Sequence, residues 1–157
     1  MSNIFYYDIA IGRIGIAENK KAITNLYFEN SFSEKYDIVK ETPLLKKAYL
    51  ELEEYFNGNR KLFDLPLAPT GTEFQKKVWK ALEEIPYGET RSYKEIATYI
   101  GNEKACRAVG MANNRNPIPI FIPCHRVIGS NGDLTGYAGG LDLKKKLLKI
   151  ENVNAAL

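Results

Sequence analysis

Residues 64–71, Asp-Leu-Pro-Leu-Ala-Pro-Thr-Gly, separate two halves of the chain that have different hydrophobic periodicity. Two prolines and a glycine so close together are typical of a linker, because proline lacks a backbone donor and disfavours helix in the residue before it. Short apolar runs come before this segment, and helical patterns come after it. We therefore predict an α+β protein with a small strand-and-helix domain at 1–65, a linker at 66–71 and a helical domain at 72–157.

The N-terminal half is predicted to be a meander of short strands followed by one helix. The apolar runs at 4–9, 14–17 and 23–28 are separated by glycines and a polar turn. Apolar residues then recur at helical spacing between Pro43, a residue favoured in the first helical turn, and Gly58, which suits the position just beyond a helix end.

Two helix starts in the C-terminal half have the spacing of a capping box. They are Thr72 with Gln75 and Ser92 with Glu95. The second helix is short and stops at Gly101-Asn102, which also offers a cap to the next helix, predicted at about 103–113. Two short helices joined by a turn that contains glycine are the pattern of a helix-turn-helix, although an ordinary helical hairpin fits the spacing equally well.

The helix predicted at 103–113 is rich in small residues, with Arg107 among them. The small residues are Ala105, Ala108, Gly110 and Ala112. Such a surface allows close approach to a nucleic-acid groove. Residues 66–157 carry 13 basic and nine acidic side chains, whereas residues 1–65 carry nine and ten. A surplus this small also fits an ordinary solvated surface.

The segment 116–127, Asn-Pro-Ile-Pro-Ile-Phe-Ile-Pro-Cys-His-Arg-Val, contains the candidate nucleophile. Its three prolines hold the chain extended as it arrives at Cys124. His125, the only histidine, follows directly and is a candidate base. Neighbouring residues of a strand point to opposite faces, so a turn or a bridging water has to connect the two side chains. A buried structural cysteine is the alternative interpretation of Cys124.

An ordinary thiol is only a few per cent thiolate at neutral pH, so its ionisation needs help. Glu151 is the candidate for orienting His125. It lies three and four residues beyond two leucines of the last predicted helix, on or beside that helix's apolar stripe, where a carboxylate needs a buried partner. A solvated residue in a fraying terminal turn is the alternative.

Several classes of protein are excluded by composition. Two cysteines and one histidine cannot build a disulfide scaffold or an ordinary structural zinc site. No stretch is apolar for the roughly 20 residues that span a bilayer, and the N-terminus does not resemble a signal peptide. We expect a soluble intracellular protein. The segment 129–140 holds five glycines and is predicted to be a loop that lines a pocket, with Tyr137 as a wall.

Five motifs resemble those of the O6-alkylguanine-DNA alkyltransferases, also called methylated-DNA–protein-cysteine methyltransferases. The motifs are Arg107-Ala-Val-Gly, Asn116-Pro-Ile-Pro, Pro123-Cys-His-Arg-Val127, Gly136-Tyr-Ala-Gly-Gly140 and Leu147-Leu-Lys-Ile-Glu151. The similarity covers about residues 70–152, and the first 65 residues resemble the family only in general layout. The implied fold is a ribonuclease H-like domain followed by a winged helix-turn-helix-like domain.

The resemblance implies a role for each matched residue. Cys124 would accept the alkyl group from O6 of guanine and be consumed, without turnover. Glu151, His125 and a water would form the relay that makes the thiolate, and Asn116 would brace the segment. Tyr93 would rotate the phosphate of the flipped nucleotide and donate a proton toward the departing guanine.

The resemblance also implies a DNA interface and a pocket. The helix-turn-helix would enter the minor groove with Arg107 in the base stack. The implied DNA contacts are Arg107, Tyr93, Ser92, Ala105, Ala108 and Gly110, and the implied pocket consists of Tyr137, Val127, Ala138, Gly139 and Asn113. Two positions depart from the family: Ala138 replaces a common serine, and Cys106 precedes Arg107, where oxidation could affect DNA binding.

These observations predict direct-reversal DNA repair by a monomer that acts on double-stranded DNA containing O6-alkylguanine. O4-alkylthymine is a further candidate substrate. No cofactor, metal or membrane is expected, and the location is cytoplasmic, or nuclear in a eukaryote. The main alternative is a helix-turn-helix regulator that senses alkylation or redox state through its cysteine. A turnover cysteine hydrolase is a third hypothesis.

Overall fold

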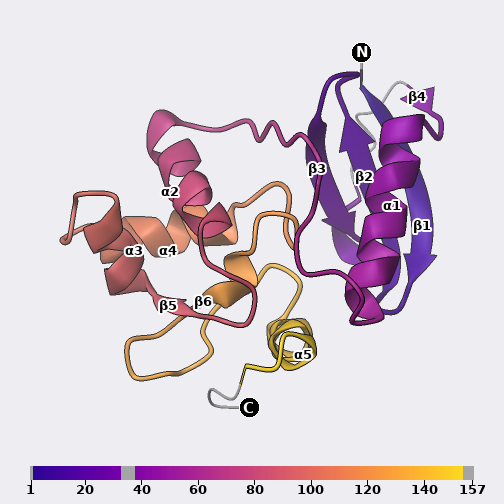
Figure 1. The fold of residues 1–157 in the computed structure, drawn as a ribbon. Coiled ribbons are helices and arrows are strands. Elements are labelled where there is room, and N and C mark those ends of the chain that lie inside the picture. The colour runs from indigo at the N-terminus through magenta and orange to yellow at the C-terminus, as the bar shows by residue number, and fades with distance from the viewer. Residues whose placement is uncertain (1, 33–37, 154–157) are drawn as a thin grey trace. The chain divides into compact units, whose positions relative to one another are not determined.

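The computed structural model describes residues 2–32 and 38–153, and the chain forms two compact units, Met1–Thr70 and Gly71–Leu157 (Figure 1). Residues 66–68 pair with strand β3 (Ile23–Phe28) through Ile23 N to Pro66 O and Ala68 N to Ile23 O, both at 2.8 Å. The first residues of the predicted linker are therefore hydrogen-bonded within the first unit.

The first unit is a four-stranded sheet with one helix on it. The sheet contains β1 (Asn3–Ile9), β2 (Gly12–Glu18), β3 and β4 (Ile38–Val39) in the order β3-β2-β1-β4. β2 is antiparallel to β1 and to β3, which confirms the predicted meander, whereas β4 is parallel to β1. A short 3-10 helix, η1 (Glu29–Ser31), follows β3.

Helix α1 (Pro43–Phe56) lies over one face of the sheet in Figure 1 and confirms the helix predicted between Pro43 and Gly58. Its start is fixed by Thr42, whose hydroxyl accepts a hydrogen bond from Leu45 N, and by Pro43 in the first turn. The apolar face of α1 and the inner face of the sheet form the core of this unit, with Ile4, Ile14, Ile16, Leu45, Leu52 and Tyr55 fully buried.

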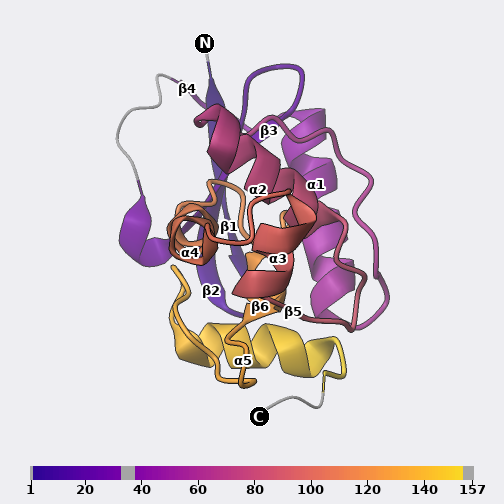
Figure 2. The ribbon, with the colours of Figure 1, turned by 90° about the vertical axis from the view of Figure 1, so that its left-hand side faces the viewer.

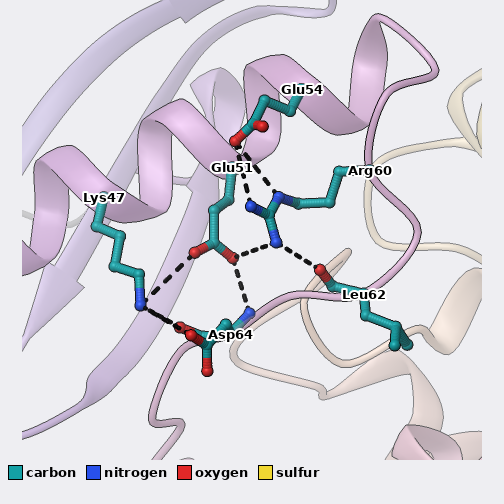
Figure 3. Close-up of polar contacts among 6 residues, drawn as sticks. All are labelled: Lys47, Glu51, Glu54, Arg60, Leu62 and Asp64. Carbon is teal, nitrogen blue, oxygen red and sulfur yellow. Dashed lines mark hydrogen bonds and ion pairs between the residues drawn. The ribbon is translucent and has the colours of Figure 1, made fainter.

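Glu51 is a buried carboxylate on α1, only 3% exposed. Figure 3 shows the Glu51 cluster, which consists of Lys47, Glu51, Glu54, Arg60, Leu62 and Asp64. The Glu51 carboxylate accepts from the backbone N of Asp64 at 2.8 Å and pairs with Arg60 at 3.6 Å and Lys47 at 3.8 Å. Arg60 also donates to the Leu62 carbonyl. The cluster therefore ties the segment after α1 back onto that helix.

The second unit contains the helices α2 (Glu73–Glu83), α3 (Tyr93–Tyr99), α4 (Cys106–Asn114) and α5 (Leu141–Ile150). A two-stranded parallel sheet joins β5 (Arg91–Ser92) to β6 (Val127–Ile128). Both predicted capping boxes are present, at Thr72–Gln75 and Ser92–Glu95. Helices α3 and α4 pack together, and they lie side by side in both Figure 1 and Figure 2.

Helix α4 begins later than predicted, at Cys106 rather than at about 103. Ala105 N donates to Asn102 O, so Asn102 belongs to a turn before the helix rather than to its cap. Ala105 is the N-cap and has no side-chain acceptor, so no capping signal in the sequence marks this start.

The core of the second unit is built around Trp79 of α2. Its indole Nε1 donates to Ala112 O of α4 at 2.8 Å, so the two helices are joined by a buried hydrogen bond as well as by packing. The apolar residues between the prolines of 116–123 are also buried in this core. Ile120 among them has a φ of 75°, a left-handed conformation that strains a β-branched residue.

No helix among residues 2–32 and 38–153 has the length and apolar composition needed to cross a membrane.

Candidate active site

Cys124 lies at the start of η2 (Cys124–Arg126), a single 3-10 turn, and is 3% exposed. The turn closes through Arg126 N to Pro123 O at 3.0 Å. The nucleophile candidate is therefore followed by a turn, which is one of the two connections that the sequence left open. Because 116–123 is stiffened by its prolines, the position of the thiol is fixed by the chain on both sides.

Two asparagines hold the backbone around Cys124. Asn116 is buried; its Nδ2 donates to Ile122 O at 2.8 Å, and its Oδ1 accepts from Ile118 N at 2.9 Å. Asn113 Nδ2 donates to Cys124 O at 3.3 Å. Both side chains therefore hold the backbone of the segment that carries the thiol. Asn116 belongs to that segment and joins Ile118 to Ile122.

Glu151 caps the C-terminal end of α5, is 2% exposed and lies against η2. One of its oxygens, Oε2, is 2.7 Å from His125 Nε2. Arg126 donates to both oxygens, from Nε at 2.8 Å and from Nη2 at 3.1 Å, and its Nη1 donates to Ile85 O at 2.7 Å. Gly88 N adds a donor at 3.3 Å. Glu151 is therefore a buried, fully partnered carboxylate rather than a solvated residue of a fraying turn.

The protonation states of Glu151 and His125 follow from these contacts. Burial alone would raise the pKa of Glu151, but the hydrogen bonds and charges of His125 and Arg126 lower it to about 2. Burial is the main cause that lowers the pKa of His125. An ionised carboxylate only accepts hydrogen bonds, so His125 Nε2 carries the proton and Nδ1 carries a lone pair.

His125 Nδ1 is buried and has no hydrogen-bond partner within the described residues. A neutral imidazole with a free basic nitrogen next to a thiol in sequence is equipped to take a proton. Burial raises the pKa of the Cys124 thiol to about 11, and contacts with Asn116, Lys144, its own backbone and Tyr137 offset part of this rise. The free protein thus holds a protonated thiol at neutral pH, and reaction requires the proton to leave.

Lys144 of α5 is a functional candidate that sequence reasoning missed. Its side chain is fully buried, and Nζ donates to Val127 O at 2.6 Å, to Thr135 O at 2.8 Å and to Gly136 O at 3.4 Å. Burial lowers its pKa to about 8. Lys144 precedes Leu147 and Leu148 by three and four residues, the same criterion that selected Glu151, so a signal for it was present in the sequence.

Arg126 was also missed as a site residue, although it stands in the Pro-Cys-His-Arg-Val motif. Its role depends on Ile85 and Glu151, which are far away in sequence and are brought together only by the fold.

The residues expected to bind DNA lie on α3, α4 and the residues just before each helix. Arg107 and Ala108 are exposed on α4, and Ala105 is half-buried. A side chain added at Gly110 would come within 3.8 Å of the Tyr93 ring, so these two residues are neighbours across the two helices. The Ser92 hydroxyl accepts from Glu95 N and is used to cap α3.

The residues expected to form the pocket come from both sides of Cys124. Val127 and Asn113 are buried, Tyr137 and Gly139 are half-buried, and Ala138 is exposed. Tyr137 lies close enough to the thiol to influence its pKa. A separate surface cavity of about 650 Å³ lies between α2 and α3, but none of the candidate catalytic residues lines it.

No group of three or more His, Cys, Asp or Glu side chains that could hold a metal ion occurs in the part of the chain that the structure describes. Cys106 and Cys124 are both free thiols.

Both parts of the chain match family models of known proteins. Residues 73–153 match the family "6-O-methylguanine DNA methyltransferase, DNA binding domain", and residues 5–69 match "6-O-methylguanine DNA methyltransferase, ribonuclease-like domain". A methylated-DNA–protein-cysteine methyltransferase of Methanosarcina barkeri is 56% identical over 95% of this chain and 98% of its own length. The constitutive enzyme of that name from Bacillus subtilis is 51% identical over 95% of this chain and 96% of its own length.

Solved structures show the same two-domain fold. Mycobacterium tuberculosis OGT in complex with DNA has a TM-score of 0.89 and 46% identity, covering 95% of this chain and 92% of that one. The expected α+β architecture, a sheet domain followed by a helical DNA-binding domain, is confirmed. The chain therefore belongs to the methylated-DNA–protein-cysteine methyltransferases, a family of DNA-repair enzymes.

Proposed function

We propose that this protein reverses alkylation damage directly, by moving a methyl or larger alkyl group from O6 of guanine in double-stranded DNA to Cys124, once per molecule. The observation that carries the proposal is the arrangement of three buried side chains. They are Cys124, a neutral His125 whose Nδ1 has no partner among the described residues, and an ionised Glu151 whose Oε2 lies 2.7 Å from His125 Nε2. This arrangement can remove a proton from the thiol without a metal or cofactor.

The proposed chemistry is a single displacement. The thiol proton moves to His125 Nδ1 through a bridging water, and the imidazolium is stabilised by Glu151. The sulfur then forms a bond to the alkyl carbon while the bond from that carbon to O6 breaks. Guanine leaves with the electron pair and takes a proton from the Tyr93 hydroxyl. Regenerating Cys124 would require its thiolate to leave the alkyl carbon of the thioether, and an unactivated thiolate is a poor leaving group, so the reaction stops after one equivalent.

Base flipping follows from the burial of the nucleophile. Cys124 is 3% exposed, so an alkylated base stacked inside a duplex cannot reach it and has to be extruded. We propose that α4 enters the minor groove and that the exposed Arg107 fills the space that the base leaves. The pocket would be formed by Tyr137, Val127, Ala138, Gly139 and Asn113, with backbone N–H groups serving O6 because Ala138 has no hydroxyl.

We propose that the protein acts as a monomer in the compartment that holds the DNA, that Asn116 braces the active segment, and that O4-alkylthymine is a second substrate. Membership of an enzyme family favours this transferase over a regulator that only senses alkylation.

The test is to incubate the protein with a duplex that contains O6-methylguanine and to determine the mass of the peptide bearing Cys124. We expect that peptide to gain one methyl group, with transfer stopping at one equivalent, and we expect Cys124→Ser to leave the lesion in place. Transfer of the methyl group to another residue, or continued turnover, contradicts the proposal.

The wedge role of Arg107 is tested separately. Arg107→Ala is expected to slow repair of duplex DNA by about tenfold, because the flipped state loses a stabilising contact. The same variant should react with free O6-benzylguanine at the wild-type rate, since no base has to be flipped. Equal losses on the two substrates would remove the wedge role.

A further inference from the structure

The loop 129–140, between β6 and α5, is held by a residue that the proposed chemistry does not use, Thr135. The Tyr93 hydroxyl donates to Thr135 O at 3.0 Å, and the Thr135 hydroxyl donates to Tyr93 Oη at 3.2 Å. One side chain at the start of α3 is thus bound by both the backbone and the side chain of a single loop residue. In the free protein, the Tyr93 hydroxyl therefore donates its hydrogen bond to the loop.

The same loop also reaches the nucleophile. Tyr137, two residues beyond Thr135, lies beside the Cys124 thiol. Lys144 Nζ joins Thr135 O and Gly136 O to Val127 O, close to Cys124 in the chain. Thr135 is thus held by Tyr93 on one side and by Lys144 on the other, in the loop that brings Tyr137 to a thiol that is 3% exposed.

Breaking the hydrogen bonds between Tyr93 and Thr135 requires little free energy. When Tyr93 leaves, Thr135 O keeps its hydrogen bond from Lys144 at 2.8 Å, so no carbonyl is left without a donor. Tyr93 and Thr135 lie at the surface, where water can replace the broken contacts. Breaking this contact therefore leaves the polar groups of Tyr93 and Thr135 with hydrogen-bond partners, either Lys144 or water. The freed Tyr93 hydroxyl becomes available to an entering base.

We propose that Tyr93 and Thr135 form a latch that keeps the loop 129–140 closed over Cys124 until a base enters, with Thr135 as a positioning residue. The latch protects a thiol that can react only once. The role of the latch rests on the proposed function, but whether the latch exists can be tested without DNA.

The test measures how fast iodoacetamide labels Cys124 in the free full-length protein. The Cys124 sulfur forms a bond to the methylene carbon and iodide leaves, so the labelling rate reports access to the thiol and its ionisation. The peptide carrying Cys106, a free thiol outside the loop, is measured in the same sample as an internal reference. Thr135→Val replaces the hydroxyl with a methyl group of similar shape, and Thr135→Ser keeps the hydroxyl.

We expect Thr135→Val to label Cys124 about threefold faster and Tyr93→Phe about tenfold faster than the wild type, because they remove one and two hydrogen bonds. Thr135→Ser should label at the wild-type rate, and Cys106 labelling should be the same in all variants. The double variant should label no faster than Tyr93→Phe, because both changes act on one contact. Wild-type labelling of Thr135→Val, multiplicative effects in the double variant, or an equal rise at Cys106 would overturn the latch.

Transfer from a duplex carrying O6-methylguanine gives a second readout. Thr135→Val should transfer the methyl group at least as fast as the wild type, since the latch has to open before reaction, whereas a residue needed only for stability would slow transfer when removed. Slower transfer therefore contradicts the latch. Absence of transfer in the wild type would overturn the proposed function instead, and the labelling comparison would still decide the latch.

Discussion

Glu51 of the first unit and Glu151 of the second are both buried and paired with an arginine, but Glu151 also has a partner that can accept a proton. Glu51 is 3% exposed and Glu151 is 2% exposed. Each accepts a backbone N–H, from Asp64 and Gly88 respectively, and each pairs with an arginine. The third partner of Glu51 is Lys47 (Figure 3), and the solvent-accessible surface of the Lys47 side chain is 48% of its maximum, so it is half exposed. The third partner of Glu151 is the fully buried His125.

This difference separates a structural cluster from a chemical one. The ammonium of Lys47 has no lone pair at neutral pH, so the Glu51 cluster can only hold the chain in place. His125 donates through Nε2 and keeps a basic Nδ1 on its other side, so the charge of Glu151 can stabilise a protonated imidazole in the residue that follows Cys124. The chemical role of a buried carboxylate therefore depends less on how many contacts it makes than on whether its partner can accept a proton.

The largest expected effect is on methyl transfer. Glu151→Gln keeps the shape of the side chain but removes the charge that stabilises the imidazolium, so single-turnover transfer should fall by about 100-fold. The matched control, Glu51→Gln, should transfer at the wild-type rate. Quench-flow measurement of methyl transfer checks both, and a similar loss in the two variants would erase the distinction between the clusters.

The same pair of variants should differ in stability. Glu151→Gln leaves Arg126 buried without its counter-ion and should lower the free energy of unfolding by about 3 kcal/mol. Glu51→Gln should cost only about 1 kcal/mol, because Lys47 and Arg60 are partly exposed and can turn to water. Urea denaturation of the full-length variants measures both values. Equal costs would show that the two clusters do not differ energetically.

The stability contributed by Glu151 should depend on pH in a defined direction. Its folded-state pKa is lowered to about 2 from an ordinary value of 4.5, so its contribution is fully present above about pH 4.5. The contribution should be lost as the pH falls toward 2, where the folded carboxylate also becomes protonated. The difference between wild type and Glu151→Gln, measured by urea denaturation from pH 6 to pH 2.5, should therefore shrink as the pH falls. A difference that grows with acid would contradict the assigned charge state.

Lys144 and Lys47 should also differ in how much each contributes to the free energy of unfolding. Lys144 is fully buried on three carbonyls, and its replacement by methionine should cost about 2 kcal/mol because those carbonyls lose a donor. Lys47→Met should change the free energy of unfolding by less than about 0.5 kcal/mol, since Lys47 is half exposed and Glu51 keeps Arg60 and the Asp64 backbone N as partners. Thermal denaturation of both variants checks this, and an equal change would mean that Lys144 does not anchor the loop.

The sequence predicted those parts of the fold and site that follow from local chemistry. Both capping boxes, helix α1 and the strand meander were predictable because caps, prolines and apolar periodicity are read over a few residues. The start of α4 was not, because Ala105 offers no capping side chain. Lys144 was missed although it lies on the same helix face as Glu151, since lysine stems commonly cover apolar surface while the charge reaches water.

Contacts between distant segments could not be predicted from spacing. The salt bridge of Arg126 with Glu151 joins residues 25 apart, and the contact of Tyr93 with Thr135 joins residues 42 apart. The loop 129–140 has no hydrophobic periodicity, so nothing in its sequence shows which carbonyl meets Tyr93. The resemblance to a family supplied the candidate roles, and the fold supplied the donors and acceptors that connect them.

The relay from Glu151 through His125 to Cys124 is tested most directly by the pH profile of single-turnover methyl transfer from O6-methylguanine in a duplex, measured for wild type, Glu151→Gln and Glu51→Gln. If Glu151 acts through His125 on the Cys124 proton, the inflection for Glu151→Gln should move to higher pH, while wild type and Glu51→Gln should have superimposable profiles. An inflection at the same pH in Glu151→Gln and wild type would contradict the relay.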